Sequence, residues 1–144
     1  MRSKKVRAAM IAAAACLSFT SVVAPSATAL AAGYTGLAQE ANGNWYYYKN
    51  NKVADDYTGL AANAYGWWYI QNGKVDFNAT GLTSNEYGWW YVQNGTIDFK
   101  TTGLAANEYG WWYVEGSKIN FNYTGLVANE YGLWNVKNGR VDFN

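Results

Sequence analysis

Short runs of aromatic and aliphatic residues recur along the chain, each followed by a polar turn. In the clearest example, Trp67-Trp68-Tyr69-Ile70 is rich in residues that favour strands, and Gln71-Asn72-Gly73-Lys74 contains an Asn-Gly hairpin turn. The next segment, Val75-Asp76-Phe77, alternates apolar and polar residues with the period of a strand. No segment has a convincing helical period. The pattern predicts β-hairpins joined by loops such as Thr58-Gly59 and Tyr65-Gly66.

The turn signal returns in later segments at Asn94-Gly95 and Asn138-Gly139, and between them Glu115-Gly116 replaces the turn pair. A Thr-Gly-Leu triplet recurs with it, and its spacings are 23, 22, 22 and 22 residues. The triplets begin at Thr35, Thr58, Thr80, Thr102 and Thr124. A fixed period indicates one supersecondary unit that buries its apolar face on its neighbours. We therefore predict an all-β fold, a β-hairpin solenoid of five stacked repeats of about 22 residues.

The five predicted units are 34–56, 57–78, 79–100, 101–122 and 123–144. Strand alternation divides the aromatic run of each unit into two faces. Trp67 and Tyr69 share one face, which we expect to point outward or into grooves between hairpins. The other face belongs in the core, because the Ile70 position stays aliphatic in later units, as Val92, Val114 and Val136. The expected core residues of the second unit are Trp68, Ile70, Val75 and Phe77.

The first and last units differ from the middle ones. The last reads Leu133-Trp134-Asn135-Val136, so it keeps the expected core pair and loses both aromatics of the other face. A solenoid end whose outward aromatics need a following repeat would have this pattern, and so would a repeat that caps the stack. The first unit, Trp45-Tyr46-Tyr47-Tyr48, has aromatics on both faces.

The N-terminal segment has the pattern of a secretory signal peptide. Four basic residues within positions 2–7 precede an apolar, alanine-rich run at 8–23 that is too short for a comfortable membrane span. Small residues at 27–31 offer cleavage sites, so we predict a signal peptide at 1–32 and a secreted repeat domain at 33–144. A lipoprotein signal acylated at Cys16 is the alternative, although the usual leucine three residues earlier is absent.

Composition narrows the chemistry of the predicted mature chain. Removal of residues 1–32 leaves 7 Lys plus Arg against 10 Asp plus Glu, a net charge of 7 − 10 = −3. The remaining chain has no Cys, Pro, Met or His, so it has no disulfide and no histidine for general-base or metal chemistry. A basic stripe for nucleic acid is also missing. We expect no cofactor, no metal, no nucleic-acid partner and no membrane span in the mature chain.

Recurrent carboxylates are the only groups that invite an enzymatic interpretation. One set recurs at Glu86, Glu108 and Glu130, and another at Asp76, Asp98 and Asp142. A pair of carboxylates can hydrolyse glycosides, but such a pair is expected once, in a deep cleft. These groups repeat with the scaffold beside turns, so we interpret them as solvated or loop-capping groups and predict that the domain is not an enzyme.

The first repeat resembles a known family. The stretch from Asn42 to Lys52, followed by Asp56 to Leu60, resembles the Gly-Asn-Trp-Tyr-Tyr to Thr-Gly-Trp repeat of bacterial choline-binding and glucan-binding cell-wall repeats. The later units, with Tyr-Gly-Trp-Trp-Tyr-Val, resemble a divergent branch found on secreted and surface proteins of Gram-positive bacteria. The resemblance covers all five units. It implies stacked hairpins whose aromatic side chains form cages for the choline of teichoic acid or platforms for glucan sugars.

The resemblance also implies a set of ligand-binding residues. Carried over by position, they are Trp45, Tyr47, Trp67, Tyr69, Trp89, Tyr91, Trp111 and Tyr113. The family's Gly-Trp is Gly-Leu here, at Leu37, Leu60, Leu82, Leu104 and Leu126, which removes one wall of a cage for a quaternary ammonium. The candidates for a replacement wall are Tyr65, Tyr87, Tyr109 and Tyr131. In the simplest alternative, the same rings only supply the buried area of a domain without disulfides.

Two functions follow from these observations. The first is a secreted, noncatalytic module, associated with the cell surface or cell wall, that binds cell-wall polymers or polysaccharides through repeated aromatic sites. The second is a structural or adhesive surface protein that self-assembles through open solenoid edges or binds a protein partner. Choline, glucan, peptidoglycan and host glycans all remain candidate ligands.

Overall fold

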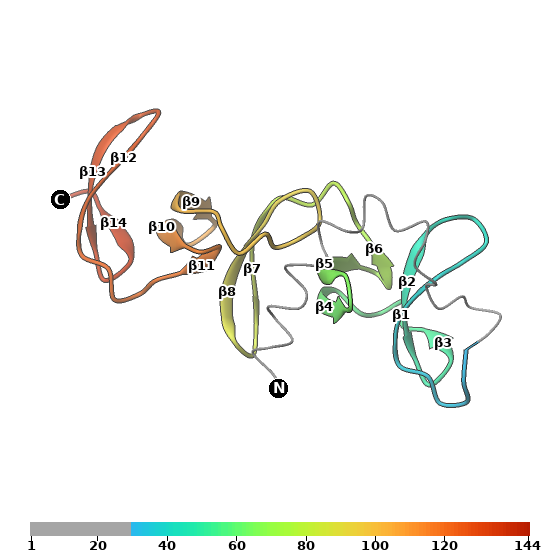
Figure 1. Ribbon diagram of the computed structural model, residues 1–144. Helices are drawn as coiled ribbons and strands as arrows, with labels where there is room; N and C mark the ends of the chain where they lie inside the picture. Colours follow the sequence, from blue (N-terminus) through green and yellow to red (C-terminus); the bar gives the residue numbers. More distant parts are fainter. Residues whose placement is uncertain (1–29) are drawn as a thin grey trace. The chain divides into compact units, whose positions relative to one another are not determined.

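The computed structural model describes residues 30–144, in which every regular element is a β-strand and no helix occurs (Figure 1). Apart from residues 30–32, the predicted signal peptide lies outside this range. The described residues form two compact units. The first runs to Ala79 and includes Asn94–Thr96, and the second contains Thr80–Gln93 and Ile97–Asn144.

The first unit holds one antiparallel sheet of six strands in the order β1-β2-β6-β5-β4, with β3 paired to β2. Its strands are β1 (Gly36–Gln39), β2 (Trp45–Lys49), β3 (Lys52–Val53), β4 (Gly59–Asn63), β5 (Gly66–Gln71) and β6 (Lys74–Val75).

The second unit holds an antiparallel sheet of eight strands in the order β12-β13-β14-β10-β11-β8-β7, with β9 paired to β10. Its strands are β7 (Gly81–Asn85), β8 (Gly88–Val92), β9 (Gly103–Asn107), β10 (Gly110–Glu115), β11 (Lys118–Ile119), β12 (Gly125–Asn129), β13 (Gly132–Lys137) and β14 (Arg140–Asp142). The prediction of an all-β fold of hairpin repeats, like a β-solenoid, is confirmed.

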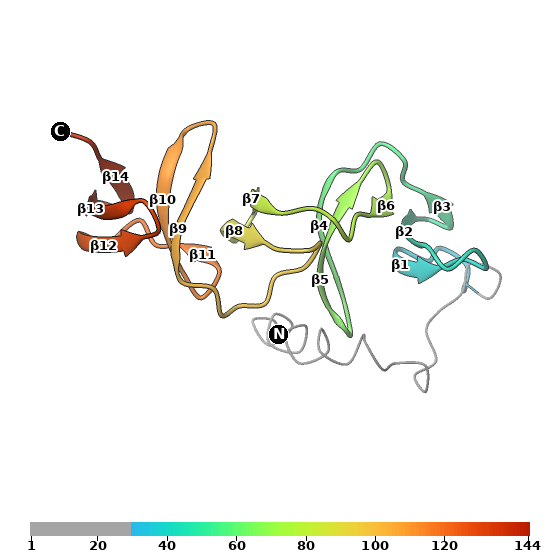
Figure 2. The ribbon, with the colours of Figure 1, turned by 90° about the horizontal axis from the view of Figure 1, so that it is seen from above.

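The longest hairpin of each repeat is one that the sequence pattern did not indicate. The segment after each Thr-Gly forms a strand that pairs along its whole length with the aromatic strand, as β4 pairs with β5 and β9 with β10 (Figure 2). The interpretation of Thr58-Gly59 as a link between hairpins, with two strands per repeat, is therefore wrong. Gly-Leu-Ala-Ala-Asn has little strand propensity of its own, and the aromatic partner holds it extended. Ala61 lies opposite Trp68, where its small side chain leaves room for the indole.

The second turn of each repeat follows the Asn-Gly prediction. Asn72 and Gly73 have φ angles of 50° and 80°, the left-handed conformation that a tight hairpin with the twist of its strands requires. In the fourth repeat the turn lies one residue later than expected. Glu115 still pairs with Lys118 in the ladder, and Gly116 and Ser117 take the positive φ angles of 60° and 67°.

A serine stands in this turn where the second, third and fifth repeats have glycine. At the equivalent Gly139, an added Cβ would lie 2.6 Å from the backbone oxygen of Asn120. Ser117 does carry a Cβ, and Phe99 of the preceding repeat, which follows Asp98, has an unusual φ of 60°. The buried Ser117 hydroxyl donates a hydrogen bond of 2.6 Å to Asp98. The altered turn keeps its backbone bonds, since Tyr91 N–H donates to Ser117 O and Ser117 N–H to Thr101 O, both at 2.7 Å, and it gains the side-chain bond to Asp98.

Successive repeats are joined by a pair of backbone hydrogen bonds that recurs along the chain. The Tyr47 N–H donates to Gly73 O at 2.8 Å, and the Gly73 N–H donates to Tyr57 O at 2.9 Å. The corresponding bonds join Tyr113, Gly139 and Tyr123, at 2.8 Å each. Each turn is therefore bonded to the middle strand of the preceding repeat, which makes the repeats stack.

The core lies mostly where strand alternation predicts. Ile70, Val92, Val114 and Val136 are at most 2% exposed, and Val75 is buried as well. Phe77 was expected in the core but is 48% exposed, because β6 ends at Val75 and the chain then turns. Its ring instead packs edge-on against Trp68, with centroids 5.8 Å apart.

Candidate functional site

Aromatic pairs recur between neighbouring repeats of the second unit. The first tryptophan of one repeat meets the tyrosine of the next edge-on, as in Trp89 with Tyr109 and Trp111 with Tyr131, both at 6.3 Å between centroids. Tyr109 and Tyr131 are 57% and 69% exposed. Each pair therefore forms a corner of two aromatic rings that is open to solvent, and Tyr109 and Tyr131 are two of the tyrosines named as candidates for a replacement wall.

In each of the last four repeats, the second tryptophan is fixed by an asparagine five residues before it. Asn129 Oδ1 accepts hydrogen bonds of 2.9 Å from Trp134 Nε1 and from the Tyr131 backbone N–H. The same Asn–Trp bond joins Asn63 to Trp68, Asn85 to Trp90 and Asn107 to Trp112. This carboxamide orients both the indole and the turn that carries the exposed tyrosine.

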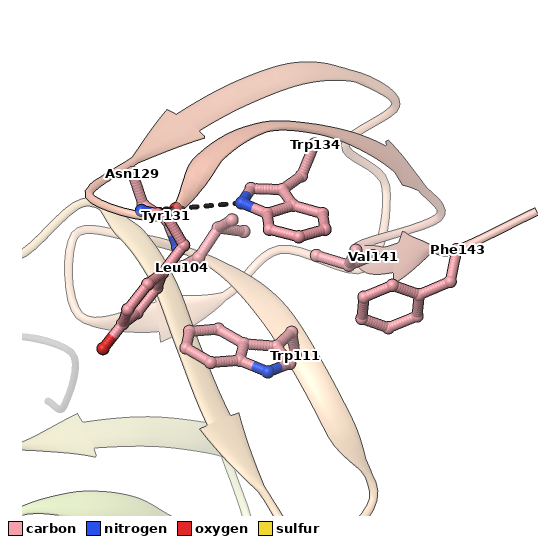
Figure 3. Close-up of a pocket in the computed structure, with 7 residues that line it drawn as sticks. All are labelled: Leu104, Trp111, Asn129, Tyr131, Trp134, Val141 and Phe143. Atoms are coloured by element: carbon pink, nitrogen blue, oxygen red, sulfur yellow. Dashed lines mark hydrogen bonds between the residues drawn. The ribbon is translucent and has the colours of Figure 1, made fainter.

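A pocket of about 320 Å³ lies between the fourth and fifth repeats, inside the second unit. Its lining residues are Leu104, Trp111, Asn129, Tyr131, Trp134, Val141 and Phe143. Trp111 and Trp134 lie on opposite sides, with Tyr131 at one end and Phe143 at the other (Figure 3). Leu104, at the position where the resembling family has tryptophan, is one of the walls.

The chemistry of this lining suits a small organic cation. Four aromatic rings surround the space and no lining residue carries a formal charge. The faces of aromatic rings are negative, so they attract a cation without binding strongly hydrated anions. Pockets of a few hundred cubic ångströms with few polar groups are typical small-ligand sites.

Carboxylates lie beside the exposed tyrosines of the same unit. A hydrogen bond from the hydroxyl to Glu108, together with the charge of that carboxylate, raises the pKa of Tyr109 above its ordinary value. Glu86 raises the pKa of Tyr87 in the same way. Glu130 precedes Tyr131 at the equivalent position. The negative charge at this end of the hairpins would favour the approach of a cation.

In two repeats, a basic side chain of the protein lies over the ring of the second tryptophan. Lys118 Nζ lies 5.2 Å from the ring centroid of Trp90, and Arg140 Cζ lies 5.6 Å from that of Trp112. Among residues 30–144, no cation of the protein lies over Trp134, the equivalent ring in the pocket. The ring of the second tryptophan thus contacts a basic side chain in the third and fourth repeats. In the last repeat the equivalent ring, Trp134, lines the pocket instead.

The predicted ligand residues fall into different environments. Trp111 lines the pocket and Trp89 forms the equivalent pair with Tyr109. Trp67 is half-buried, whereas Trp45 is 8% exposed and packs in the core of the first unit, so its expected outward position is wrong. Trp45 is buried because Leu37 and Tyr65 pack in the same cluster.

The predicted tyrosines do not line the pocket with Trp111. Tyr47 packs against Tyr57 with centroids 4.7 Å apart, and Tyr113 stacks on Tyr123 at 3.9 Å. Tyr69 and Tyr91 are half-buried. They have no tyrosine to stack on, because the positions equivalent to Tyr57 and Tyr123 are Ala79 and Thr101 in their repeats.

Six of the seven pocket residues were not among the predicted ligand residues. Tyr131 was named only as a candidate replacement wall and Leu104 only as the position of the family's tryptophan, and the other four are Asn129, Trp134, Val141 and Phe143. Alternation assigned Trp134 to the core, yet it is only half-buried and open to the pocket. Asn129 had a signal in the sequence, since an asparagine stands five residues before the second tryptophan in four repeats.

Over the part of the chain that the structure describes, no group of three His, Cys, Asp or Glu side chains could hold a metal ion. That part also has no helix long and apolar enough to cross a membrane.

Comparison with protein families gives one match that recurs five times. The model of the choline-binding repeat matches residues 33–53, 56–76, 78–98, 100–120 and 122–142. No curated protein matches the chain.

Proposed function

Because these matches cover most of the chain, the protein belongs to the choline-binding repeat family, and we propose that it is a secreted module that holds cell-wall polymers by their quaternary ammonium groups. Members of this family are binding modules of the cell surface and not catalytic domains. The pocket between Trp111 and Trp134 is the proposed site for the ammonium group.

The pocket itself is the observation that supports this proposal. A trimethylammonium group is weakly hydrated and carries its charge on methyl groups, so it gains from several aromatic faces at once. Trp111, Tyr131 and Trp134 supply these faces, and Leu104 supplies an apolar contact for the methyl groups. The leucine that replaces the family's tryptophan therefore forms an aliphatic wall in a pocket that is also lined by four aromatic rings.

Further weak sites are proposed at the other predicted ligand residues on the half-buried face. They are Tyr47, Trp67, Tyr69, Trp89, Tyr91 and Tyr113, with Trp89 and Tyr109 forming the corner most similar to the pocket. Several weak contacts to one polymer chain give a much higher avidity than a single contact. The proposal therefore concerns a polymer decorated at many positions.

Titration of the chain from residue 33 with free choline, followed by calorimetry, tests the proposal. Trp111→Ala removes one wall and should weaken choline binding by about tenfold or more, since tenfold corresponds to only ~1.4 kcal/mol. Phe121→Ala is the control, because Phe121 packs edge-on against Trp112 outside the pocket. Equal losses in the two variants, or a wild-type chain that ignores choline, would refute the proposed site.

Exposed apolar side chains of the last repeat favour a second candidate, a structural or adhesive protein that self-associates. Leu126 and Leu133 are 63% and 64% exposed, and Phe143 is 69% exposed. Burial of such side chains against another molecule would be favourable. Light scattering at increasing protein concentration tests this candidate, and a constant monomer mass would eliminate self-association.

A further inference from the structure

The first repeat is one residue longer than the others, and the extra residue lies in the turn between β1 and β2. Residues 40–44 separate Gln39 from its ladder partner Trp45, whereas only 63–66 separate Ala62 from Trp67. As a result, Asn44 precedes the aromatic strand of the first repeat. A glycine holds this position in every later repeat, as Gly66, Gly88, Gly110 and Gly132.

In the second unit, a basic side chain from the next repeat passes directly over this glycine. Lys118 pairs with Trp90 in the ladder, and its side chain runs over Gly88 to the indole. A Cβ at Gly88 would lie 2.7 Å from Lys118 Cε, and one at Gly110 would lie 2.9 Å from Arg140 Nε. A side chain at this position would therefore force the side chain of the cation to shift.

The corresponding ladder pair of the first unit is Tyr46 with Lys74. Among the described residues, Lys74 makes no cation–π contact with Tyr46, in contrast to Lys118 on Trp90. Asn44 stands where the glycine would be, and its Nδ2 lies 3.4 Å from the Tyr46 hydroxyl. A groove of about 360 Å³ lies between these first two repeats, and both Asn44 and Lys74 are among its lining residues.

The groove combines an aromatic ring with hydrogen-bonding groups. Its lining includes Asn44, Gln71, Lys74, Asp76 and Phe77. Phe77 is 48% exposed, and its edge-on contact with Trp68 fixes the orientation of the ring. Lys74 and Asp76 contribute opposite charges, so the groove has no formal charge overall.

A sugar has the complementary chemistry, because a pyranose ring presents an apolar C–H face and a rim of hydroxyl groups. Carboxamides and a carboxylate bond such hydroxyls, and the Lys74 ammonium can donate to a ring or hydroxyl oxygen. A quaternary ammonium would meet one ring only, beside a lysine of the same charge. We propose that this groove binds a pyranose unit of a saccharide chain, stacked on Phe77 and hydrogen-bonded by Asn44, Gln71 and Asp76.

This saccharide site and the proposed ammonium pocket lie in different repeats and take different chemical groups, so each can fail without the other. If both are occupied, the domain holds the sugar backbone of a polymer as well as its cationic substituents. Such a two-group contact would raise avidity for decorated polymers over either free ligand.

A matched pair of phenylalanine variants tests the proposal. Phe77 and Phe121 are both 48% exposed and pack edge-on against their tryptophans at 5.8 and 5.7 Å. The full chain from residue 33 is titrated with soluble glucose oligomers and, separately, with N-acetylglucosamine oligomers. Phe77→Ala should weaken saccharide binding by about tenfold or more, the effect of ~1.4 kcal/mol, while Phe121→Ala leaves it unchanged.

The oligomer series that binds identifies the sugar, and choline binding should be the same in both variants. A second pair, Gln71→Ala and Gln93→Ala, removes carboxamides at equivalent positions of two repeats. Both side chains are exposed, so neither substitution should unfold the chain, and a difference in binding reports on the groove. Only Gln71→Ala should weaken saccharide binding. Failure of the wild-type chain to bind either oligomer series, or equal losses within each pair, would overturn the proposal.

Discussion

Trp134 Nε1 and Asn129 Oδ1 are joined by a hydrogen bond of 2.9 Å, which fixes one wall of the pocket to the turn that carries another. Because the same oxygen accepts the Tyr131 backbone N–H, the positions of the two rings are coupled through a single side chain. The geometry of the pocket therefore depends on a polar residue that a ligand need not touch.

Asn129→Ala should weaken choline binding while leaving the chain folded. Loss of its two hydrogen bonds should cost about 1–2 kcal/mol of stability, the usual contribution of such bonds. Asn107→Ala is the matched control, since Asn107 makes the same bonds to Trp112 and the Tyr109 N–H. Calorimetry with choline and thermal unfolding of both variants check the prediction. The prediction is wrong if Asn107→Ala lowers choline affinity as much as Asn129→Ala does.

Gly110→Ala should be more destabilising than Gly132→Ala. Both glycines have φ of 139°, so both substitutions carry the same backbone strain. An added Cβ at Gly110 would meet Arg140 Nε at 2.9 Å, whereas the one at Gly132 has nothing within 4 Å. The difference in unfolding free energy between the variants measures the displaced contacts of Arg140, over the Trp112 ring and to the Tyr109 backbone oxygen. Equal destabilisation would show that this contact contributes nothing.

Asp98 should make the stability of the second unit fall at low pH. Burial by itself would raise the pKa of Asp98, but hydrogen bonds from the Ser117 hydroxyl and from the Lys100 and Thr101 groups outweigh it, and the pKa lies below its ordinary value. The stabilisation is therefore complete above the unfolded-state pKa, near ~3.9, and is lost as pH falls through the lower folded-state value. Denaturant unfolding between neutral and acid pH measures it. Asp98→Asn should flatten this dependence, and an unchanged slope would contradict the assignment.

Tyr48 should give the first unit a stability change at high pH. Burial, followed by the hydrogen bond to Glu40 and the charge of that carboxylate, raises the pKa of Tyr48 to about 12. A raised pKa means that its stabilising effect is complete below the unfolded-state value, ~10, and is lost as pH rises towards 12. Ultraviolet titration of tyrosinate in wild type and Tyr48→Phe checks this value. If the variant keeps an unchanged tyrosinate titration at about 12, another residue is responsible.

The sequence by itself determined the repeat, the strands of the aromatic segment and most of the core. Period-two alternation places Ile70 and Val75 inside because each belongs to a strand, and the Asn-Gly pair fixes the hairpin turn through its left-handed backbone. These features depend on local conformation, which neighbouring residues decide.

Only the tertiary structure decided which rings are open to a ligand. Trp45 and Trp111 occupy equivalent places in their repeats, yet one is buried and the other lines a pocket. Side chains from the next repeat make the difference, since Tyr65 packs in the core with Trp45 while Tyr131 meets Trp111 edge-on and stays exposed. Such contacts join residues about 20 positions apart, and alternation along one strand carries no information about them.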